Sequence, residues 1–318
     1  MNPVVILFND VGANPSPDDL DTLEQAKAVY AAVRETRSAV LFPFKTLADL
    51  SGFPSACTVF NLAEEFNGDA YQAYKIPEIL EKQQLPFTGC GSLAMKNTGD
   101  KVAAKLLMAS FGINTAAFVT KEQVYGFMPG AYLIKPMRQS GSIGIDQSSV
   151  VTADSAQQLR MLLAQKDKTY GFFAERYIDG REVSVSLIET KNGAIALPPR
   201  EMRFLNNSKG YKILDYASKW DEGSASYKNT VSATMTDPAD KKLLKTLEAV
   251  CFRLWEHFSL RGYARIDFRL DEFEVPFVLE VNCNPCLAPP DSSFFLAAQS
   301  AGFTFNDTIN GLITYAKY

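Results

Sequence analysis

A pair of predicted strands in the last fifth of the chain constrains the fold more than any other feature. Residues 263–270 and 276–282 alternate between the two faces of a strand, and the polar segment that joins them is typical of a turn. Two strands joined this closely form an antiparallel hairpin. We expect its turn to close tightly around Phe273 and Glu274, which sets the pairing of every residue in the hairpin.

This pairing brings four polar side chains together. Asp267 lies opposite Glu280, Arg265 lies opposite Asn282, and the two-residue period of a strand puts all four on one face. Two carboxylates and an amide are oxygen donors suited to Mg²⁺, which keeps positions free for water and substrate phosphates. The alternative is an ordinary solvated sheet face, and the spacing by itself favours neither interpretation.

The composition indicates a globular protein that acts on small molecules. The 318 residues are 47% hydrophobic and 21% charged, which is enough for a core and predicts two or three domains. The net charge is -4, and with no basic stripe the sequence argues against a nucleic-acid partner. No run reaches the roughly 18 apolar residues of a membrane helix, so we expect no membrane partner and a cytoplasmic location.

Cysteine and histidine usage argues against several kinds of site. Five cysteines, an odd number in a chain of this length, do not make a disulfide framework and fit a reducing compartment. Cys283 and Cys286 form one C-x-x-C pair, a weak zinc signal without a second pair of ligands. The single histidine, His257, lies in an apolar helical segment, so we expect it to be a packing or surface residue and expect no Ser-His-Asp triad.

The order of predicted elements indicates a mixed fold, first α/β and then α+β. Residues 4–8 have the continuous apolar character of a buried parallel strand, residues 19–33 have helical spacing, and residues 39–43 and 58–62 are predicted strands. Further predictions are helices at 100–111, 238–258 and 292–301, and strands at 132–135, 145–151, 172–177 and 182–188.

A loop rich in glycine and serine follows the predicted strand that ends at Lys135. Residues 137–144, MRQSGSIG, have small side chains that let backbone N–H groups approach phosphate oxygens. Surface loops of this composition are common, and the segment matches neither a Walker motif nor a dinucleotide fingerprint. Lys135 favours the phosphate interpretation, because an ammonium at the strand end can reach a phosphate.

Five segments, in order along the chain, resemble the D-alanine:D-alanine ligases of the ATP-grasp superfamily. They are PFTGCGSLAMKNTGDKVAAKLLMASFGI, YLIKPMRQSGSIGI, FAERYIDGREVSVSLI, LDYASKW and RGYARIDFRLDEFEVPFVLEVNCNP. The resemblance covers about residues 85–318 and implies a three-domain ATP-grasp fold. Its parts would be an N-terminal α/β pre-ATP-grasp domain (1–96), a central ATP-grasp lid domain (97–180) and a C-terminal ATP-grasp domain with the metal site (181–318).

The resemblance also implies an activity. Such enzymes are ADP-forming ligases that transfer the γ-phosphate of ATP to a carboxylate, and an amine then attacks the acyl phosphate. The implied cofactors are ATP and two Mg²⁺ ions, with Mn²⁺ able to substitute. Small-molecule carboxylate and amine substrates and, by analogy with the family, a homodimer are expected.

Carried over residue by residue, the resemblance gives roles to most polar residues of the five segments. Lys101 and Lys135 would contact ATP phosphates, and Ser142 would cover them with neighbouring loop amides. Arg265 would stabilise the charge of the reacting groups, and Lys219 would lie in a mobile loop that closes over the site. The remaining roles are Glu175, Arg176, Tyr177 and Ile178 along the adenine, Glu182 at the ribose, and Asp267, Glu280 and Asn282 at the two metal ions.

The N-terminal segment departs from the family pattern. The family's Gly-Gly turn, with a Ser and a Glu that holds the first D-alanine's ammonium, is missing, and FNDVGANPSPDDLD stands in its place. Asp18, Asp19 or Asp21 could replace that glutamate. The alternative is that they only complement the dipole of the helix they begin.

Three further departures fall at expected substrate contacts. Gly141 and Trp220 replace a serine and a tyrosine, so the family's Ser-Tyr hydrogen bond cannot form. Cys286 replaces a glycine whose amide helps form the oxyanion hole, although a backbone donor can survive this change. Asp291 replaces the serine that binds the second D-alanine's carboxylate, and an aspartate there repels a carboxylate and suits a cationic group.

These departures predict an active ligase for small amino acids or related metabolites, with substrates other than two D-alanines. One alternative is a genuine D-alanine:D-alanine ligase of cell-wall synthesis. Others are a kinase that stops after phosphoryl transfer and a nucleotide-binding regulatory protein without turnover. Arg265 argues against the last, because a binding protein has no need of a charge-stabilising guanidinium. The sequence names neither the substrates nor their chirality, nor the pathway.

Overall fold

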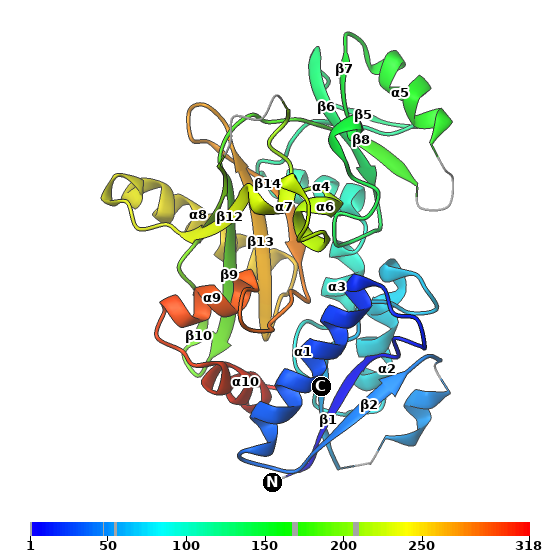
Figure 1. The fold of residues 1–318 in the computed structure, drawn as a ribbon, viewed down its shortest axis with the longest axis vertical. Coiled ribbons are helices and arrows are strands. Elements are labelled where there is room, and N and C mark those ends of the chain that lie inside the picture. Colours follow the sequence, from blue (N-terminus) through cyan, green and yellow to red (C-terminus); the bar gives the residue numbers. More distant parts are fainter. Residues whose placement is uncertain (1, 47, 54–55, 167–170, 206–209) are drawn as a thin grey trace.

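The computed structural model describes residues 2–46, 48–53, 56–166, 171–205 and 210–318 (Figure 1). Within these ranges the strands form three sheets, which lie one above another in Figure 1: a five-stranded sheet at the top, a six-stranded sheet in the middle and a three-stranded sheet at the bottom. No helix in these ranges is long and apolar enough to cross a membrane. The mixed fold class predicted from the sequence is confirmed.

The three-stranded sheet is parallel and has β1 (Val4–Asn9) at its centre. β2 (Ala39–Phe44) and β3 (Thr58–Asn61) flank β1, and α1 (Pro17–Arg34) makes the crossover that a parallel pair needs. Alternate β1 side chains enter two separate hydrophobic cores, one with α1 and one with α2 (Lys75–Lys82). Burial on both faces explains the continuous apolar run.

The five-stranded sheet is antiparallel in the order β5-β4-β8-β6-β7. Its strands are β4 (Phe118–Val119), β5 (Val124–Tyr125), β6 (Gly130–Pro136), β7 (Val150–Ala153) and β8 (Phe172–Arg176), and α5 (Ala156–Gln165) packs on it. The predicted strand at 145–151 is wrong over its first residues. Asp146 caps the 3-10 turn Gln147–Ser149 by accepting from Ser149 N, and β7 begins only after it.

The six-stranded sheet has the order β12-β11-β9-β13-β14, with β10 also paired to β9. Its strands are β9 (Glu182–Thr190), β10 (Gly193–Ala196), β11 (Arg200–Phe204), β12 (Thr230–Thr234), β13 (Tyr263–Leu270) and β14 (Pro276–Asn282). α8 (Lys241–His257) and α4 (Lys101–Ser110) share its core. The domain boundaries stay a prediction.

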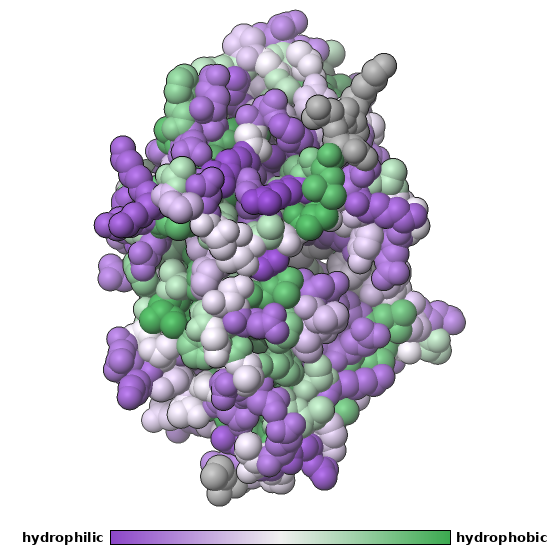
Figure 2. All heavy atoms as spheres, turned by 60° about the vertical axis from the view of Figure 1, so that its left-hand side comes forward, coloured by the Kyte–Doolittle hydropathy of each residue, from purple (hydrophilic) through white to green (hydrophobic). Residues whose placement is uncertain are grey.

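The other elements complete the chain. They are α3 (Ser92–Thr98), α6 (Tyr216–Trp220), α7 (Ala225–Lys228), α9 (Ser293–Ser300), α10 (Phe305–Thr314) and the 3-10 turns Asp49–Gly52, Ala70–Tyr74 and Pro238–Asp240. In Figure 2 the visible face is largely hydrophilic, with hydrophobic side chains in small separate groups. Most large hydrophobic side chains thus lie in the cores, and His257 is an exposed residue whose ring stacks on Phe111.

The hairpin has the predicted strands and the predicted pairs at its functional end. Asp267 pairs with Glu280, and Arg265 pairs with Asn282. The expected tight turn is wrong: Asp271 N donates to Val275 O, so the loop has three residues, and Glu274 is left-handed with φ of 57°. A β-bulge after Asp267 shifts the pairing by one residue and offsets the changed turn.

Candidate active site

One pocket lies between the five-stranded and six-stranded sheets and collects most of the predicted site residues. The predicted residues that line it are Lys101, Lys135, Ser142, Glu175, Arg176, Tyr177, Ile178, Glu182, Lys219, Arg265, Asp267, Glu280 and Asn282. They come from both sheets, the glycine- and serine-rich loop, α4 and α6. The structure thus brings together residues that are far apart in the sequence, while their individual roles stay predictions.

The hairpin carboxylates each have a cationic partner. Arg265 holds Asp267 with two parallel hydrogen bonds, Nε to Oδ1 at 2.7 Å and Nη2 to Oδ2 at 2.9 Å. Lys101 Nζ lies 3.1 Å from Glu280 Oε1 and also donates to Gln139 O at 2.6 Å. Burial alone would raise the pKa of Glu280, but Lys101 and Lys135 lower it to about 2, so this carboxylate is ionised at neutral pH.

The oxygen donors of the hairpin fit magnesium. Among the described residues, no group of three or more His, Cys, Asp and Glu side chains is placed to hold a metal ion. The hairpin offers two carboxylates and the amide of Asn282, a small oxygen set that leaves positions for phosphate oxygens. Cys283 is buried and contacts Thr98 Oγ1 at 3.2 Å, so the structure gives no support to zinc at the C-x-x-C pair.

Lys219 adds a further basic side chain to this pocket. It lies on α6, and burial together with Arg265 lowers its pKa, although Asp267 and Glu280 act in the opposite direction. Burial would also lower the pKa of Arg265, but Asp267 outweighs it and the net shift is upward, so Arg265 stays protonated. Lys101, Lys135, Lys219 and Arg265 line the pocket together with Asp267 and Glu280, and these four basic side chains give a site that favours an anionic ligand.

Glu175 forms an ion pair with Lys105, a residue that the sequence reasoning missed. Its Oε2 lies 2.5 Å from Lys135 Nζ, and its Oε1 pairs with Lys105, which is completely buried and also donates to Thr115 Oγ1 at 2.7 Å. Burial would raise the pKa of Glu175, yet the two lysines lower it. Lys105 lies on α4 in the core of the six-stranded sheet, whereas Glu175 lies on β8, so this ion pair links the two sheets.

The signal for Lys105 was present in the sequence. It stands four residues after Lys101 on the same helix, so the two lysines share one helix face. The neighbouring residues Ala104 and Met108 belong to the hydrophobic core. A lysine on a buried face needs an acidic partner, and that requirement could have directed attention to it.

The residues predicted to lie along the nucleotide are held by local contacts. Glu182 accepts from Arg269 Nη2 at 2.7 Å, and burial raises its pKa despite this partner. Tyr177 packs edge-on against Tyr211, with ring centroids 5.0 Å apart. Arg176 lines the pocket and donates to the backbone oxygens of residues 128 and 129.

Two hydrogen bonds join the glycine- and serine-rich loop to α6 and to residue 214, which precedes α6. Trp220 Nε1 donates to Gly141 O at 3.0 Å, and Ser142 Oγ donates to Leu214 O at 2.7 Å. The two positions that lack the family's Ser-Tyr bond are therefore still joined, by an indole and a backbone carbonyl. Trp220 itself does not line the pocket.

The acidic start of α1 divides into two roles. Asp19 completes a capping box with Ser16, whose Oγ donates to it at 2.5 Å, so its placement supports the helix-capping alternative. Asp21 instead contacts the Cys286 thiol, whose pKa is raised by burial and by this carboxylate. The side chain of Asp18 lies outside the described residues. Asp21 is therefore a better candidate than Asp19 for a substrate contact.

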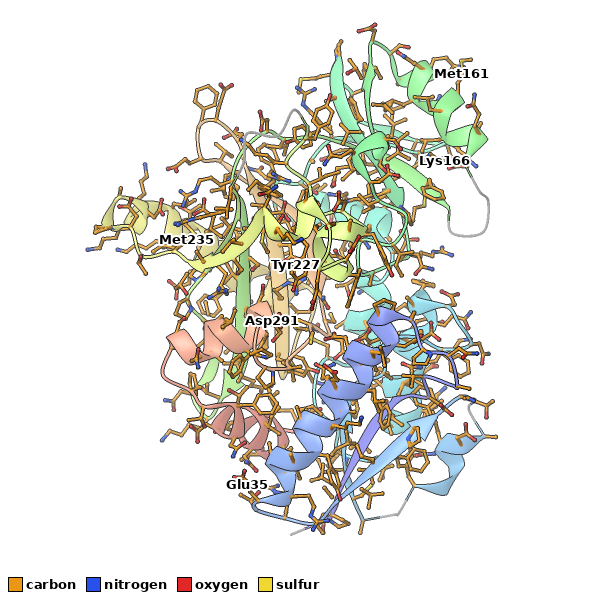
Figure 3. All side chains as sticks on the ribbon, in the orientation of Figure 1. Glu35, Met161, Lys166, Tyr227, Met235 and Asp291 are labelled. Atoms are coloured by element: carbon orange, nitrogen blue, oxygen red, sulfur yellow. The ribbon has the colours of Figure 1, made fainter. Side chains whose placement is uncertain are left out.

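Asp291 lies at the exposed end of the segment before α9. Figure 3 shows it beside Tyr227 of α7, and its charge contributes to the raised pKa of that phenol, after burial and Glu222. Asp291 and Cys286 do not line the pocket. The residues predicted for substrate thus lie outside the cluster of predicted nucleotide and metal residues.

Two sheets enclose the pocket, with an oxygen-donor hairpin on one and Lys135 beside a glycine- and serine-rich loop on the other, and this arrangement defines an ATP-grasp protein. The family described as D-ala D-ala ligase C-terminus matches residues 107–314, and the chain belongs to this family. It is an ATP-dependent, ADP-forming ligase of the class that makes carbon–nitrogen bonds. The predicted family, fold class and enzyme class are confirmed.

Known relatives and structures agree with this assignment. The chain is 30% identical to the uncharacterized protein y4sG of Sinorhizobium fredii, over 81% of this chain and 74% of that protein. It is 28% identical to the D-alanine--D-alanine ligase of Aquifex aeolicus, over 74% of this chain and 75% of that enzyme. The Bacillus anthracis D-alanine--D-alanine ligase complexed with ATP superposes with a TM-score of 0.72 and 18% identity, covering 99% of this chain and 96% of that one.

Proposed function

We propose that this chain joins a small carboxylate substrate to an amine substrate, through an acyl phosphate, and that the pair is not two D-alanines. One observation carries the proposal. Asp267, Glu280 and Asn282 converge in the pocket with the basic side chains of Lys101, Lys135, Lys219 and Arg265, while the departures from the family pattern fall at the predicted substrate contacts. The nucleotide and metal machinery is therefore retained, and substrate recognition has changed.

The residues of the pocket suit this chemistry. Asp267, Glu280 and Asn282 would hold two Mg²⁺ ions, and when bound, Mg²⁺ neutralises phosphate oxygens while ATP supplies the phosphoryl group that activates the carboxylate. Lys101 and Lys135 would bind phosphate oxygens, and Arg265, which stays protonated, would stabilise charge on the acyl group as the amine attacks.

The loop contacts suit closure over such a site. Trp220 connects α6 to the glycine- and serine-rich loop, and Ser142 connects this loop to residue 214 just before α6. These contacts would exclude water from a reactive acyl phosphate. Lys219, on α6, lines the same pocket and would contact phosphate oxygens there. We further propose a cytoplasmic homodimer by analogy with the family.

The second candidate is a genuine D-alanine:D-alanine ligase. It is favoured by the named relatives and by the Trp220–Gly141 hydrogen bond, which preserves the loop contact with different atoms. It is disfavoured by Asp291, because an aspartate repels the carboxylate of a second D-alanine and suits a cationic group. A regulatory protein without turnover is disfavoured by the protonated Arg265.

ADP release across paired L- and D-amino acids, diamines and ω-amino acids tests the proposal. We expect turnover only with a pair, a condensed product mass, and little activity with D-alanine alone. Asp291→Ser should weaken the binding of a cationic acceptor. Asp154→Ser changes another exposed aspartate and serves as the matched control. Efficient condensation of two D-alanines would instead establish the second candidate, and ADP release with a carboxylate alone would indicate a kinase.

A further inference from the structure

Arg200 is a charged side chain that is buried at the pocket without an acidic partner among the described residues. It stands at the start of β11, lines the pocket and is only 7% exposed. Its Nε donates to Ser232 Oγ at 2.8 Å, its Nη1 to Thr234 Oγ1 at 2.9 Å, and its Nη2 to Ser232 O at 2.9 Å. All three acceptors are neutral, and burial lowers the pKa of Arg200 with no carboxylate to offset it.

Neighbouring arginines of the same sheet are compensated. Arg265 and Arg269, both on β13, pair with Asp267 and Glu182 at 2.7 Å. A buried charge without a partner is costly, and proteins normally pair it or neutralise it. A guanidinium has five N–H donors, of which Arg200 uses three in these hydrogen bonds. Positive charge and free donors at a pocket wall are what an anionic ligand requires.

The sheet pairing places Arg200 in the same row as the predicted metal ligands. Ser184 on β9 pairs with Arg200 on one side and with Asp267 on the other. Directly paired residues point to one face of a sheet, so Arg200 faces the pocket beside the hairpin. Strands lie about 4.8 Å apart, which puts the backbone of Arg200 about 10 Å from that of Asp267.

We propose that Arg200 binds a substrate carboxylate other than the one that is phosphorylated. This inference rests on the proposed function and narrows its substrate class to molecules with a second, unreacted carboxylate remote from the bond being made. Lys101 pairs with Glu280 at the β14 edge of the row, whereas Arg200 reaches toward β12 at the opposite side. That separation favours a substrate group over an ATP phosphate. Ser293 also lines the pocket and provides a further hydroxyl donor.

Kinetics of Arg200→Gln and Arg200→Lys test this site. Glutamine removes the charge but can still bond to the β12 hydroxyls, and lysine keeps the charge but loses the planar fork. We expect Arg200→Gln to raise the KM of one carboxylate substrate by about 10- to 100-fold, with the KM of ATP within about twofold of wild type. The KM of Arg200→Lys for this substrate should lie between those of the wild type and Arg200→Gln. Arg203→Gln changes an exposed arginine of the same strand and should have the KM of the wild type.

Carboxamide analogues separate binding from a structural role. The wild type should bind the carboxamide of that substrate poorly, and Arg200→Gln should then cause no further loss. Equal losses for carboxylate and carboxamide, or no change in either KM, would mean that Arg200 only fixes β12 to β11. A rise confined to the KM of ATP would assign it to a nucleotide phosphate. Each of these results overturns the proposal.

A binding measurement gives an answer without turnover. Thermal unfolding is followed with a non-hydrolysable ATP analogue, Mg²⁺ and the same amino acids or their carboxamides. We expect a carboxylate to stabilise the wild type more than its carboxamide does, and this difference to vanish in Arg200→Gln. Equal stabilisation by both in the wild type would refute the Arg200 site. Absence of condensation, with the carboxylate preference intact, would refute the proposed ligation and leave this site standing.

Discussion

Replacing Lys105 by methionine should destabilise the protein strongly, because it removes half of the positive charge around Glu175. Lys105 is completely buried and contacts both Glu175 and Thr115. Breaking a buried ion pair from one side costs about 3–5 kcal/mol, and since Lys135 still pairs with Glu175, we expect the lower end, about 3 kcal/mol. At roughly 2–4 °C per kcal/mol, the melting temperature should fall by about 6–12 °C.

Thermal unfolding by circular dichroism measures this effect, and a double-mutant cycle assigns its cause. Glu175→Gln should cost at least about 1 kcal/mol less in the Lys105→Met background than in the wild type, because the first change has already disrupted the pair. The KM of ATP should also rise, since Lys105 links the two sheets that line the pocket. Lys82→Met is the control: this lysine pairs with Glu78 on the surface and is 70% exposed.

Two outcomes would refute the reasoning about Lys105. A melting temperature within about 1 °C of wild type would mean that the buried ammonium contributes no net stability. Additive effects of the two substitutions would mean that Lys105 acts independently of Glu175.

Three further predictions concern the pocket. Glu280→Gln should lower kcat/KM by more than about 100-fold at any Mg²⁺ concentration, whereas Glu272→Gln in the exposed turn should leave it unchanged. Near-normal activity of Glu280→Gln would refute the assignment of Glu280 as a metal ligand. Trp220→Phe loses the hydrogen bond to Gly141 O and should lower kcat/KM by about 2- to 10-fold, with Trp255→Phe as the control. Unchanged kinetics would show that this bond does not order the contact between α6 and the glycine- and serine-rich loop. The pKa of Glu175 is lowered on folding, so its stabilisation is present above its unfolded pKa of about 4.3 and lost as pH falls below it. Urea unfolding between about pH 5 and 3 should therefore depend less on pH in Glu175→Gln than in the wild type, and equal slopes would contradict the lowered pKa.

The hairpin could be predicted from sequence because its information is local. Strand alternation placed Asp267 and Glu280 on one face, and the structure has the same pairs. The turn prediction failed, since three loop residues and a bulge give the same register beyond Asp267 as a tight turn would. Alternation of side chains reveals the faces of a strand, but it does not distinguish two routes to one pairing.

The helical spacing indicates that Lys105 is buried, but the identity of its partner, like the position of Arg200, depends on distant parts of the chain. Nothing in the sequence around Lys105 indicates that its ion-pair partner is Glu175, on another sheet. Arg200 lies on a strand that was not predicted, and only its pairing with Ser184 places it beside the hairpin. Tertiary pairing, rather than propensity or motif, determines these positions.

Because of the bulge after Asp267, the length of the turn does not by itself determine which residues pair at the site. The loop is exposed, with Phe273 at 78%, so its length is under weak packing constraint. Without the bulge, a change of one residue in the turn would move Glu280 and Asn282 to the opposite face of the sheet. A one-residue change in the loop can therefore be absorbed by gaining or losing the bulge. Related chains are free to vary in hairpin length while the oxygen donors stay aligned, and alignments that force a gap-free hairpin will misplace them.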